Sequence, residues 1–398
     1  MRILFLNEYF PPDTSATAKV AAALVETLAE THQVTVLAGR PSYDPSTRHP
    51  FYVWRREKQG NLVVERVGST AFHRRSMRGR LANYLSYLGL AMLRGLTIPA
   101  DIVVAMTDPP VCGIAGAFLA FLRRLPFVYS IQDLYPDMVL AGGIVKPTWW
   151  VGRWERLHRW ALKRAARVRV LGDDARERII AKGVETGRVV VVRDGARIPD
   201  SLPAADHPVV QEIRSGFRFV VLHAGNIGFS GAWETLVQAA RLLEKEGVGL
   251  IFVGDGALRP QLEAAAAGCR AIRFLPFRPP EEVPFVLAAG DLQVVTLRRG
   301  LEGVVVPSKM YPVFAAGRPV LAVAPEESDV ARIVRRHACG LIADPDNPAA
   351  VAAAVQQACG AGPQLDAMGH RARQAAAGFN VVDQLRLFRR VVEEAAAT

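Results

Sequence analysis

The chain has 398 residues, of which 50% are hydrophobic, 22% charged and 8% aromatic. This ordinary globular composition excludes a disordered, collagen-like or coiled-coil chain, and at roughly 100 to 200 residues per domain the length indicates two or three domains. Residues 1–200 hold 29 basic and 18 acidic residues and residues 201–398 hold 20 of each, so the first half carries the whole net charge of +11. The first half is therefore expected to bind a polyanion or an anionic membrane surface. The alternative is that the protein is soluble and generally basic.

The four cysteines are scattered and show no CxxC or His/Cys spacing typical of a metal site. They are expected to be reduced thiols in a cytoplasmic protein. The first residues, MRILFLNEYFPP, enter an apolar strand pattern directly, so no signal peptide is expected. The longest apolar runs, such as residues 111–122, are shorter than the roughly 20 residues that span a bilayer. The chain is therefore expected to lie on a membrane, if it meets one, and not to cross it.

Short β-rich apolar runs alternate with longer helical patterns in both halves, which is typical of βα units around a parallel sheet. In the first half a helical pattern covers residues 17–31, and the expected strands are residues 3–6, 33–37, 62–67, 102–105, 127–131, 167–171 and 189–192. In the second half helical patterns include residues 233–246 and 349–359, and the expected strands are residues 219–223, 249–253, 271–274, 293–296, 320–323 and 340–342. Between the halves lies IPDSLPAADHP, which has the composition of a linker.

This order predicts an α/β protein with two Rossmann-like, doubly wound domains that face each other across a cleft. The N-terminal domain is expected over residues 1–200, the linker over 201–208 and the C-terminal domain over 209–379. A closing helix over residues 380–398 has no assigned docking site, and the N-terminal domain is one candidate. Ligands of such sheets bind at the carboxyl ends of the strands, so the cleft is the expected site.

Four stretches of the second half share a strand, a glycine-bearing or polar turn and a helix start: HAGNIGFSGAWETL, FVGDGALRPQL, TLRRGLEGVVVPSKMYPVFAAGRP and PEESDVARIV. A glycine-rich turn at a helix start exposes backbone N–H groups to a phosphate, and the helix dipole favours the anion. Each turn alone is more typical of a tight turn than of a ligand site. Their order along the chain is a stronger signal.

With this order of motifs, the chain resembles the family 4 glycosyltransferases of the two-domain GT-B fold, and in particular the WbuB-like and WcaI-like transferases of bacterial surface-polysaccharide assembly. The resemblance covers nearly the whole chain. The segments that carry it are NEYFPPDTSATA, IQDLYPD, HAGNIG, FVGDG, FLPFRPPEEVPFVLAAGDLQVV and, most specifically, GLEGVVVPSKMYPVFAAGRPVLA. The resemblance implies that the C-terminal domain binds a nucleotide-diphosphate sugar, expected to be a UDP-sugar.

The resemblance also implies which residues hold this donor. Beside the phosphates and the sugar it places Gly225, Asn226 and Gly228, and near the base and ribose it places Gly254, Asp255 and Gly256. Facing the diphosphate it places the turn of Val305, Val306, Pro307, Ser308 and Lys309. Lys309 at a helix start would neutralise a leaving diphosphate without a metal, so neither a metal nor a cofactor is expected. The alternative for Lys309 is an ordinary solvated lysine.

Two features depart from the family pattern. The family carries two glutamates eight residues apart, the second of which holds the ribose hydroxyls, whereas here Val304 and Pro312 occupy those places. Glu302 is therefore expected as a contact to the donor sugar, and the ribose contact is left open. The basic residue that commonly follows the GN-G turn is also missing, and Arg298 and Arg299 are candidate substitutes or solvated arginines.

In the first half, DLYPD follows a predicted strand, and its proline breaks the helical geometry that would align Asp133 and Asp137 as an acid/base pair. Asp133 is expected to be an acceptor-side base or hydroxyl contact, or else the cap of the next helix. Asp137 and the loop over residues 9–17 are expected to line the acceptor and phosphate side; the loop contributes Pro12, Thr14 and Ser15.

Basic residues are concentrated in two segments, residues 73–96 and 146–170. The second interleaves tryptophans with arginines, which suits a membrane interface; the residues expected there are Trp149, Trp150, Arg153 and Trp154. The alternative is a Trp-rich core helix with a solvated basic face.

Together these features predict a retaining, metal-independent glycosyltransferase of the hexosyltransferase class. It would use a lipid-linked (polyprenyl-diphosphate) or glycan acceptor in surface-polysaccharide synthesis, as a peripheral protein on the cytoplasmic face of the cell membrane. The alternatives are a sugar-nucleotide epimerase or phosphorylase on the same fold, or a basic nucleic-acid-binding protein. Nucleic acid is not the expected partner, because no RRM, KH or helix-turn-helix pattern is present.

Overall fold

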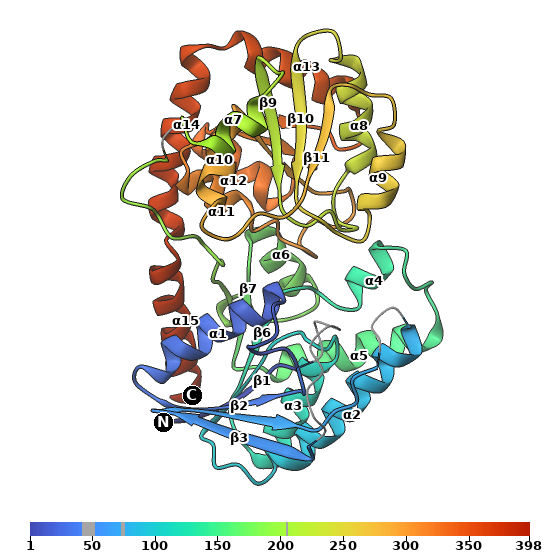
Figure 1. Cartoon of the computed structure of the whole chain (residues 1–398). Coiled ribbons are helices and arrows are strands. Elements are labelled where there is room, and N and C mark those ends of the chain that lie inside the picture. Colours follow the sequence, from blue (N-terminus) through green and yellow to red (C-terminus); the bar gives the residue numbers. More distant parts are fainter. Residues whose placement is uncertain (42–51, 73–75, 204–205) are drawn as a thin grey trace. The chain divides into compact units, whose positions relative to one another are not determined.

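The computed structural model describes residues 1–41, 52–72, 76–203 and 206–398. Two predicted segments are only partly covered, since residues 73–75 of the first basic segment and residues 204–205 of the linker lie outside the described residues. The chain forms two compact units (Figure 1), one from Met1–Val192 with Val382–Thr398 and one from Arg193–Val381.

The first unit is built on an eight-stranded sheet of order β3-β4-β2-β1-β5-β6-β7-β8. All neighbours are parallel except β3 and β4, which are antiparallel. Ile3 of the central strand is in register with Val34 on one side and Ile102 on the other. The strands are β1 Arg2–Leu6, β2 Gln33–Ala38, β3 Trp54–Gln59, β4 Leu62–Val67, β5 Ile102–Ala105, β6 Phe127–Ser130, β7 Arg167–Val170 and β8 Val189–Val191.

Helices cover both faces of this sheet. On one face α1 and the C-terminal helix α15 share a core with β1, β2 and β5, to which α15 contributes Phe388, Val391 and Val392. On the other face α3 packs on β5 and β6 and lies between α2 and α5. The helices are α1 Ala16–Ala29, α2 Met77–Gly95, α3 Cys112–Arg123, α4 Asp137–Ala141, α5 Trp149–Arg164, α6 Asp173–Ala181, the 3-10 turn η1 Thr186–Arg188, and α15 Val381–Ala396.

The second unit has a six-stranded, wholly parallel sheet of order β11-β10-β9-β12-β13-β14. On one face α8, α9 and α13 bury a core around Phe252 and Leu321, and on the other α7 and α10 cover Leu222 and Ile251. The strands are β9 Phe219–Ala224, β10 Val248–Val253, β11 Ile272–Leu275, β12 Leu292–Thr296, β13 Val320–Val323 and β14 Gly340–Ala343. The helices are α7 Pro208–Arg214, α8 Trp233–Leu242, α9 Arg259–Ala265, α10 Val283–Ala289, α11 Met310–Ala315, α12 Asp329–His337, α13 Pro348–Gly360, α14 Pro363–Ala376 and the 3-10 turn η2 Ala377–Phe379.

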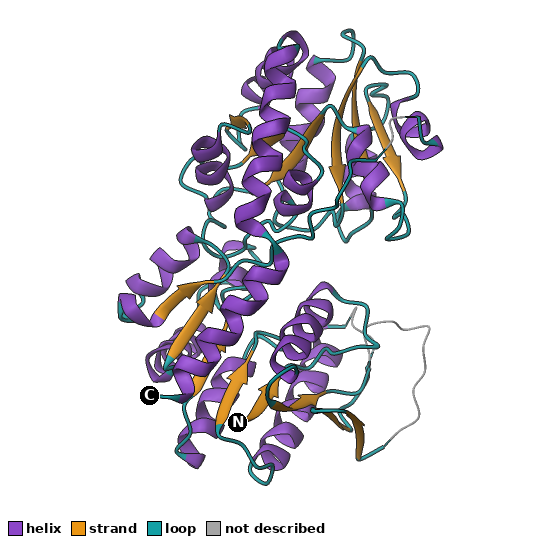
Figure 2. Cartoon of the chain, turned by 90° about the vertical axis from the view of Figure 1, so that its left-hand side faces the viewer, coloured by secondary structure: helices purple, strands orange, loops and turns teal. Residues whose placement is uncertain are grey.

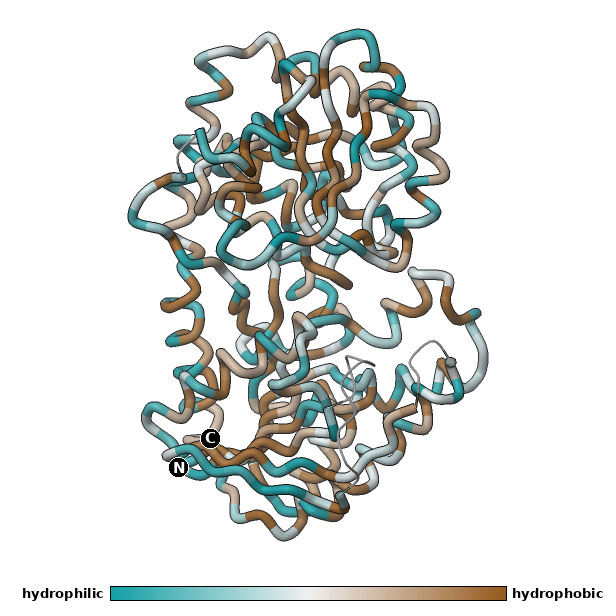
Figure 3. Tube along the Cα trace, viewed as in Figure 1, coloured by the Kyte–Doolittle hydropathy of each residue, from teal (hydrophilic) through white to brown (hydrophobic). Residues whose placement is uncertain are grey.

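The predicted fold class of two Rossmann-like domains is confirmed, and every strand expected from the sequence is present within a residue or two of its predicted ends. The strand that the analysis missed is β3, whose sequence WRREKQ is hydrophilic throughout (Figure 3). As an edge strand it buries almost nothing, so it lacks the apolar run by which the other strands were recognised.

The chain passes between the two units at residues 192–193 and again at 381–382. Close to these points, Ala196 forms an isolated parallel bridge with Asn380, so the outgoing and returning segments run side by side in the second unit (Figure 2). Arg193 pairs there with the buried carboxylate of Asp329 at 3.1 Å. Within the described ranges, no helix combines the length and the apolar character needed to span a bilayer.

Candidate functional site

Two glycine loops at the carboxyl end of the second sheet lie backbone against backbone. Gly225 N–H donates to the Val253 carbonyl and Ile227 N–H to the Asp255 carbonyl, each at 2.8 Å. A Cβ added to Gly254 would lie 2.0 Å from the Gly225 carbonyl oxygen, and its φ of +148° also disfavours a side chain. The loop after β10 therefore needs glycine to approach the loop after β9 this closely.

Lys309, directly before α11, extends into the loop that follows β9. Its Nζ donates to the Asn226 carbonyl at 2.8 Å and lies 3.5 Å from Nε2 of His223. A Cβ on Gly225 would lie only 2.5 Å from the Cε of Lys309. The structure thus brings Gly225, Asn226 and Lys309 together, because the absence of a side chain at Gly225 makes room for the lysine.

The charge of Lys309 is not neutralised by the protein. Its two hydrogen-bond partners are uncharged, and no acidic side chain in the described part of the chain forms an ion pair with it. Burial lowers the pKa of Lys309 to about 8. A half-buried cation that keeps only neutral partners is costly unless an anion approaches it, so this position can bind an anionic group.

His223, on β9, is a site residue that the sequence analysis did not single out. It is fully buried, and burial together with the charge of Lys309 holds its pKa well below the ordinary value. Its Nδ1 lies 3.4 Å from the Val294 carbonyl, which favours a proton on Nδ1 and leaves Nε2 to accept from Lys309. The histidine is therefore neutral and orients the ammonium. Its position as the first residue of HAGNIG was the available signal.

The remaining donor residues form the turns around this centre. Val306 is buried, whereas Val305, Pro307 and Ser308 are partly exposed. The backbone carbonyl of Ser308 accepts a hydrogen bond from the N–H of Tyr311 at the start of α11. The Glu302 carboxylate accepts from Gly300 N–H at 2.9 Å, which holds it against its own loop. Its predicted contact to a donor sugar stays a prediction. The remaining three, Gly228, Asp255 and Gly256, lie in the glycine loops, where the Asp255 carboxylate accepts from Gly256 N–H at 2.7 Å.

The two candidate substitute arginines have different surroundings. Arg299 pairs with Asp344 at 2.9 Å and with Asp346 at 2.7 Å on the surface of the second unit. These two carboxylates balance the charge of Arg299 in this structure. Arg298 instead has its side chain at a cavity beside the loop after β9.

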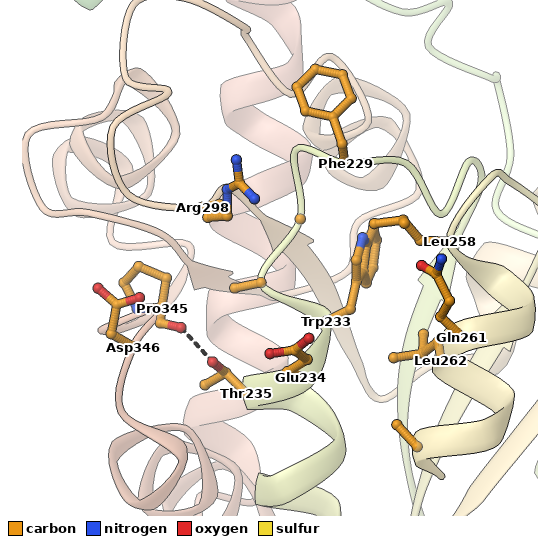
Figure 4. Close-up of a pocket in the computed structure, with 13 residues that line it drawn as sticks. Phe229, Trp233, Glu234, Thr235, Leu258, Gln261, Leu262, Arg298, Pro345 and Asp346 are labelled. Carbon is orange, nitrogen blue, oxygen red and sulfur yellow. Dashed lines mark hydrogen bonds between the residues drawn. The ribbon is translucent and has the colours of Figure 1, made fainter. Parts of the chain in front are cut away.

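This cavity has a volume of about 230 Å³ (Figure 4). Trp233 at the start of α8 forms one wall, and its ring also meets His223 edge-on at a centroid distance of 4.8 Å. The indole N–H donates to the Gly228 carbonyl, so Trp233 ties the cavity wall to the glycine loop. The lining residues are Phe229, Gly231, Ala232, Trp233, Glu234, Thr235, Leu258, Gln261, Leu262, Ala265, Arg298, Pro345 and Asp346.

Several residues predicted on the acceptor side have structural roles in the first unit. Ser15 is the N-cap of α1, where its Oγ accepts from Ala18 N–H at 3.0 Å. Asp137 opens α4 and pairs with Lys182 at 2.7 Å. Pro12 and Thr14 of the same predicted loop are exposed. Whether these residues also contact a substrate stays a prediction.

Asp133 follows β6 and its backbone N–H points to the hydroxyl of Thr107 at 3.5 Å. The N-cap position of α4 is Pro136, so the alternative that Asp133 caps this helix is wrong. Burial raises the pKa of Tyr135 above its ordinary value, and the negative charge of Asp133 raises it further. Asp133 therefore lies beside a tyrosine at the carboxyl end of the first sheet, which is the edge at which ligands of such sheets bind.

Family models match both units. One, described as a glycosyl transferase 4-like domain, matches residues 15–195, and the other, glycosyl transferases group 1, matches residues 218–360. The chain belongs to the family 4 glycosyltransferases. This glycosyltransferase is similar to WbjE of Pseudomonas aeruginosa, named a glycosyltransferase, with 26% identity over 71% of this chain and 72% of WbjE. It is also 24% identical to WcaI of Escherichia coli K12, named for colanic acid biosynthesis, over 90% of this chain and 92% of WcaI.

Solved structures share the fold of this glycosyltransferase. HepE of Anabaena in complex with UDP-glucose superposes with a TM-score of 0.70 at 17% identity, covering 99% of this chain and 100% of HepE. Sucrose-phosphate synthase of Thermosynechococcus elongatus gives a TM-score of 0.76 at 14% identity, covering 100% and 99% of the two chains. These similarities support the GT-B architecture of the two units.

Proposed function

We propose that this glycosyltransferase transfers a sugar from a nucleotide diphosphate, UDP in the first instance, and that Lys309 binds the diphosphate. The observation that carries the proposal is the half-buried ammonium of Lys309, which has only neutral partners and lies against Gly225 in the loop after β9. A diphosphate would supply the missing negative charge. Its bound position beside Gly225 and Asn226 would then place the sugar next to the same loop.

In the reaction, the bond between the sugar C1 and the diphosphate oxygen breaks, and the electron pair stays on that oxygen. The acceptor hydroxyl oxygen forms the new bond to C1 on the face that the leaving group vacates, and its proton passes to the leaving phosphate. The product keeps the configuration at C1, as expected for the family that the sequence resembles. Lys309 stabilises the charge that develops on the diphosphate, so no metal is needed.

Other predicted residues take supporting positions in this proposal. Glu302, already held by Gly300 N–H, would receive a hydroxyl of the donor sugar. Asp133 at the end of β6 would contact the acceptor hydroxyl on the first unit. The similarity to WcaI, which is named for colanic acid biosynthesis, supports a role in polysaccharide synthesis. The acceptor in this proposal is a lipid-linked sugar or a glycan. The UDP complexes of HepE support a UDP-sugar donor.

Thermal shift with nucleotide diphosphates tests the proposal. UDP is expected to raise the melting temperature equally in EDTA and in magnesium, and Lys309→Ala should remove most of this shift. Lys245→Ala, an exposed lysine of the same unit, is the matched control and should keep it. Stabilisation by magnesium alone, or an equal shift with NAD, would contradict the proposal. Conversion of the donor sugar without any acceptor would favour an epimerase instead.

A further inference from the structure

The outward side of α2 is apolar where a helix in contact with water normally carries charge. Between Arg80 and Arg94 the helix has no charged residue. Its most exposed positions in this stretch include Leu81, Leu85 and Leu93, whose exposed fractions are 55%, 60% and 67%. Their spacing of four and eight residues places them on one side of the helix. Helix α2 is thus apolar on its exposed side as well as on its buried side, which is unusual for a helix in water.

The two neighbouring helices also expose large apolar side chains. α3 packs against both α2 and α5 (Figure 1). We define the outer helical face as the large exposed apolar side chains of these helices: Leu81, Leu85 and Leu93 of α2, Phe118, Phe121 and Leu122 of α3, and Trp149, Trp150, Leu157 and Trp160 of α5. Trp154 does not belong to it, because its ring is only partly exposed and stacks against Tyr135 and Trp150.

The charge on these helices has one sign. Together α2, α3 and α5 contain nine basic residues and one acidic residue, Glu155. That glutamate is already paired with Lys182 at 2.8 Å and with Arg159 at 2.6 Å. Exposed basic side chains such as Arg153 and Arg156 therefore lie next to exposed leucines and tryptophans without a compensating acidic surface on the same helices.

We propose that the outer helical face binds a lipid bilayer that contains anionic lipids. Leucine and phenylalanine side chains would enter the boundary between headgroups and acyl chains, tryptophans would lie at headgroup level, and arginines would meet lipid phosphates. A second copy of this chain fits poorly, because it would bring like charges together. The inference goes beyond the glycosyl transfer and does not depend on the identity of donor or acceptor.

Flotation of the full chain with vesicles tests the contribution of the exposed apolar side chains to membrane binding. Vesicles of phosphatidylglycerol and phosphatidylcholine in equal parts should carry the protein upward, and phosphatidylcholine alone should bind at least tenfold less. The double variant Leu85→Glu/Leu93→Glu should reduce binding to the mixed vesicles at least tenfold. The matched control is Leu242→Glu on α8 of the second unit, whose side chain is 59% exposed, and it should float like the parent chain.

Replacement of arginines by glutamine tests the contribution of the basic side chains to vesicle binding. Arg153→Gln/Arg156→Gln should weaken binding to the mixed vesicles about tenfold, whereas Arg270→Gln/Arg336→Gln, with the same change in net charge at exposed positions of the second unit, should not. Melting temperatures within a few degrees of the parent value show that each variant is folded. The proposal is overturned if the parent chain does not float, if Leu85→Glu/Leu93→Glu floats equally well, or if that variant instead turns a dimeric parent into a monomer without lipid present.

Discussion

Each unit contains a lysine with little exposure to solvent, and the two lysines differ in whether the protein neutralises their charge. Lys182 in the first unit is 9% exposed and pairs with Asp137 at 2.7 Å and Glu155 at 2.8 Å. Lys309 in the second unit is partly buried, and its partners are a carbonyl oxygen and a neutral histidine. The first lysine ties α4 and α5 to the end of α6, while the second keeps its charge available for a ligand.

The difference shows that burial alone does not identify a functional charge. Burial penalises both ammonium groups, and what separates them is whether the protein itself provides the counter-charge. Carboxylates next to Lys182 make it part of the fold. Their absence next to Lys309 keeps an anion site open in the described structure, and the lowered pKa of Lys309, about 8, is its electrostatic signature. Substitution of either lysine tests this difference.

The largest effect is expected for Lys309→Ala in a glycosyl-transfer assay. Loss of the ammonium removes stabilisation of the developing diphosphate charge, and kcat/KM should fall about 100- to 1000-fold. Stability should change little, because no ion pair is broken. Steady-state kinetics and urea unfolding measure the two quantities, with Lys245→Ala as the control. A variant that loses stability and keeps its kcat/KM would make Lys309 a structural lysine like Lys182.

The opposite pattern is expected for Lys182→Ala. Asp137 and Glu155 would be left partly buried without their shared cation, which should lower the free energy of unfolding by about 2–3 kcal/mol. UDP binding by the second unit should be unchanged. Urea unfolding and a UDP titration at a temperature where the variant is folded test this. Weakened UDP binding with normal stability would contradict the structural role.

Acid should act on the stability of the first unit through His158 of α5. This histidine is fully buried, and burial lowers its pKa to about 4 from an ordinary value of 6.5. The folded state thus favours the neutral imidazole. The contribution of His158 to the free energy of unfolding is fully present above pH 6.5 and is lost as the pH falls toward 4, which lowers the free energy of unfolding by about 2–3 kcal/mol at pH 4.5. Unfolding of the parent and His158→Phe should differ in slope between pH 7 and 4.5. Parallel curves would show that His158 does not titrate on unfolding.

A rise in pH above 8 should weaken donor binding, because Lys309 loses its proton. This effect is expected to be smaller than those of the substitutions above. The free site has a pKa of about 8, so the cation that attracts the diphosphate is present below pH 8 and is lost above it. The affinity for UDP should therefore fall about twofold from pH 7 to 8 and approach a fall of about tenfold per pH unit above pH 8. Isothermal titration between pH 7 and 9.5 measures it. Lys309→Arg should move the fall beyond this range, and a parent profile without any fall would contradict the assignment.

The fold could be read from the sequence to a large extent. Parallel strands buried on both faces are continuous apolar runs, such as residues 102–105, and these were placed almost to the residue. Strand β3 could not be found in this way because its sequence WRREKQ has no apolar run. The glycine loops and Lys309 were predicted by their family resemblance and by the chemistry of helix starts. His223 was not, because its place at the start of HAGNIG does not show which residue it contacts, and its partner Lys309 lies 86 residues away.

By itself the sequence determined the two α/β units, the positions of the glycine turns and the excess of positive charge in the first half, because these follow from local patterns and composition. Only the tertiary structure decided which charges are neutralised. Asp137 and Lys182 are 45 residues apart and Lys309 and Asn226 are 83 apart, yet each pair is in hydrogen-bond contact. The availability of a charge is a property of what packs around it, and that depends on contacts between segments distant in the chain.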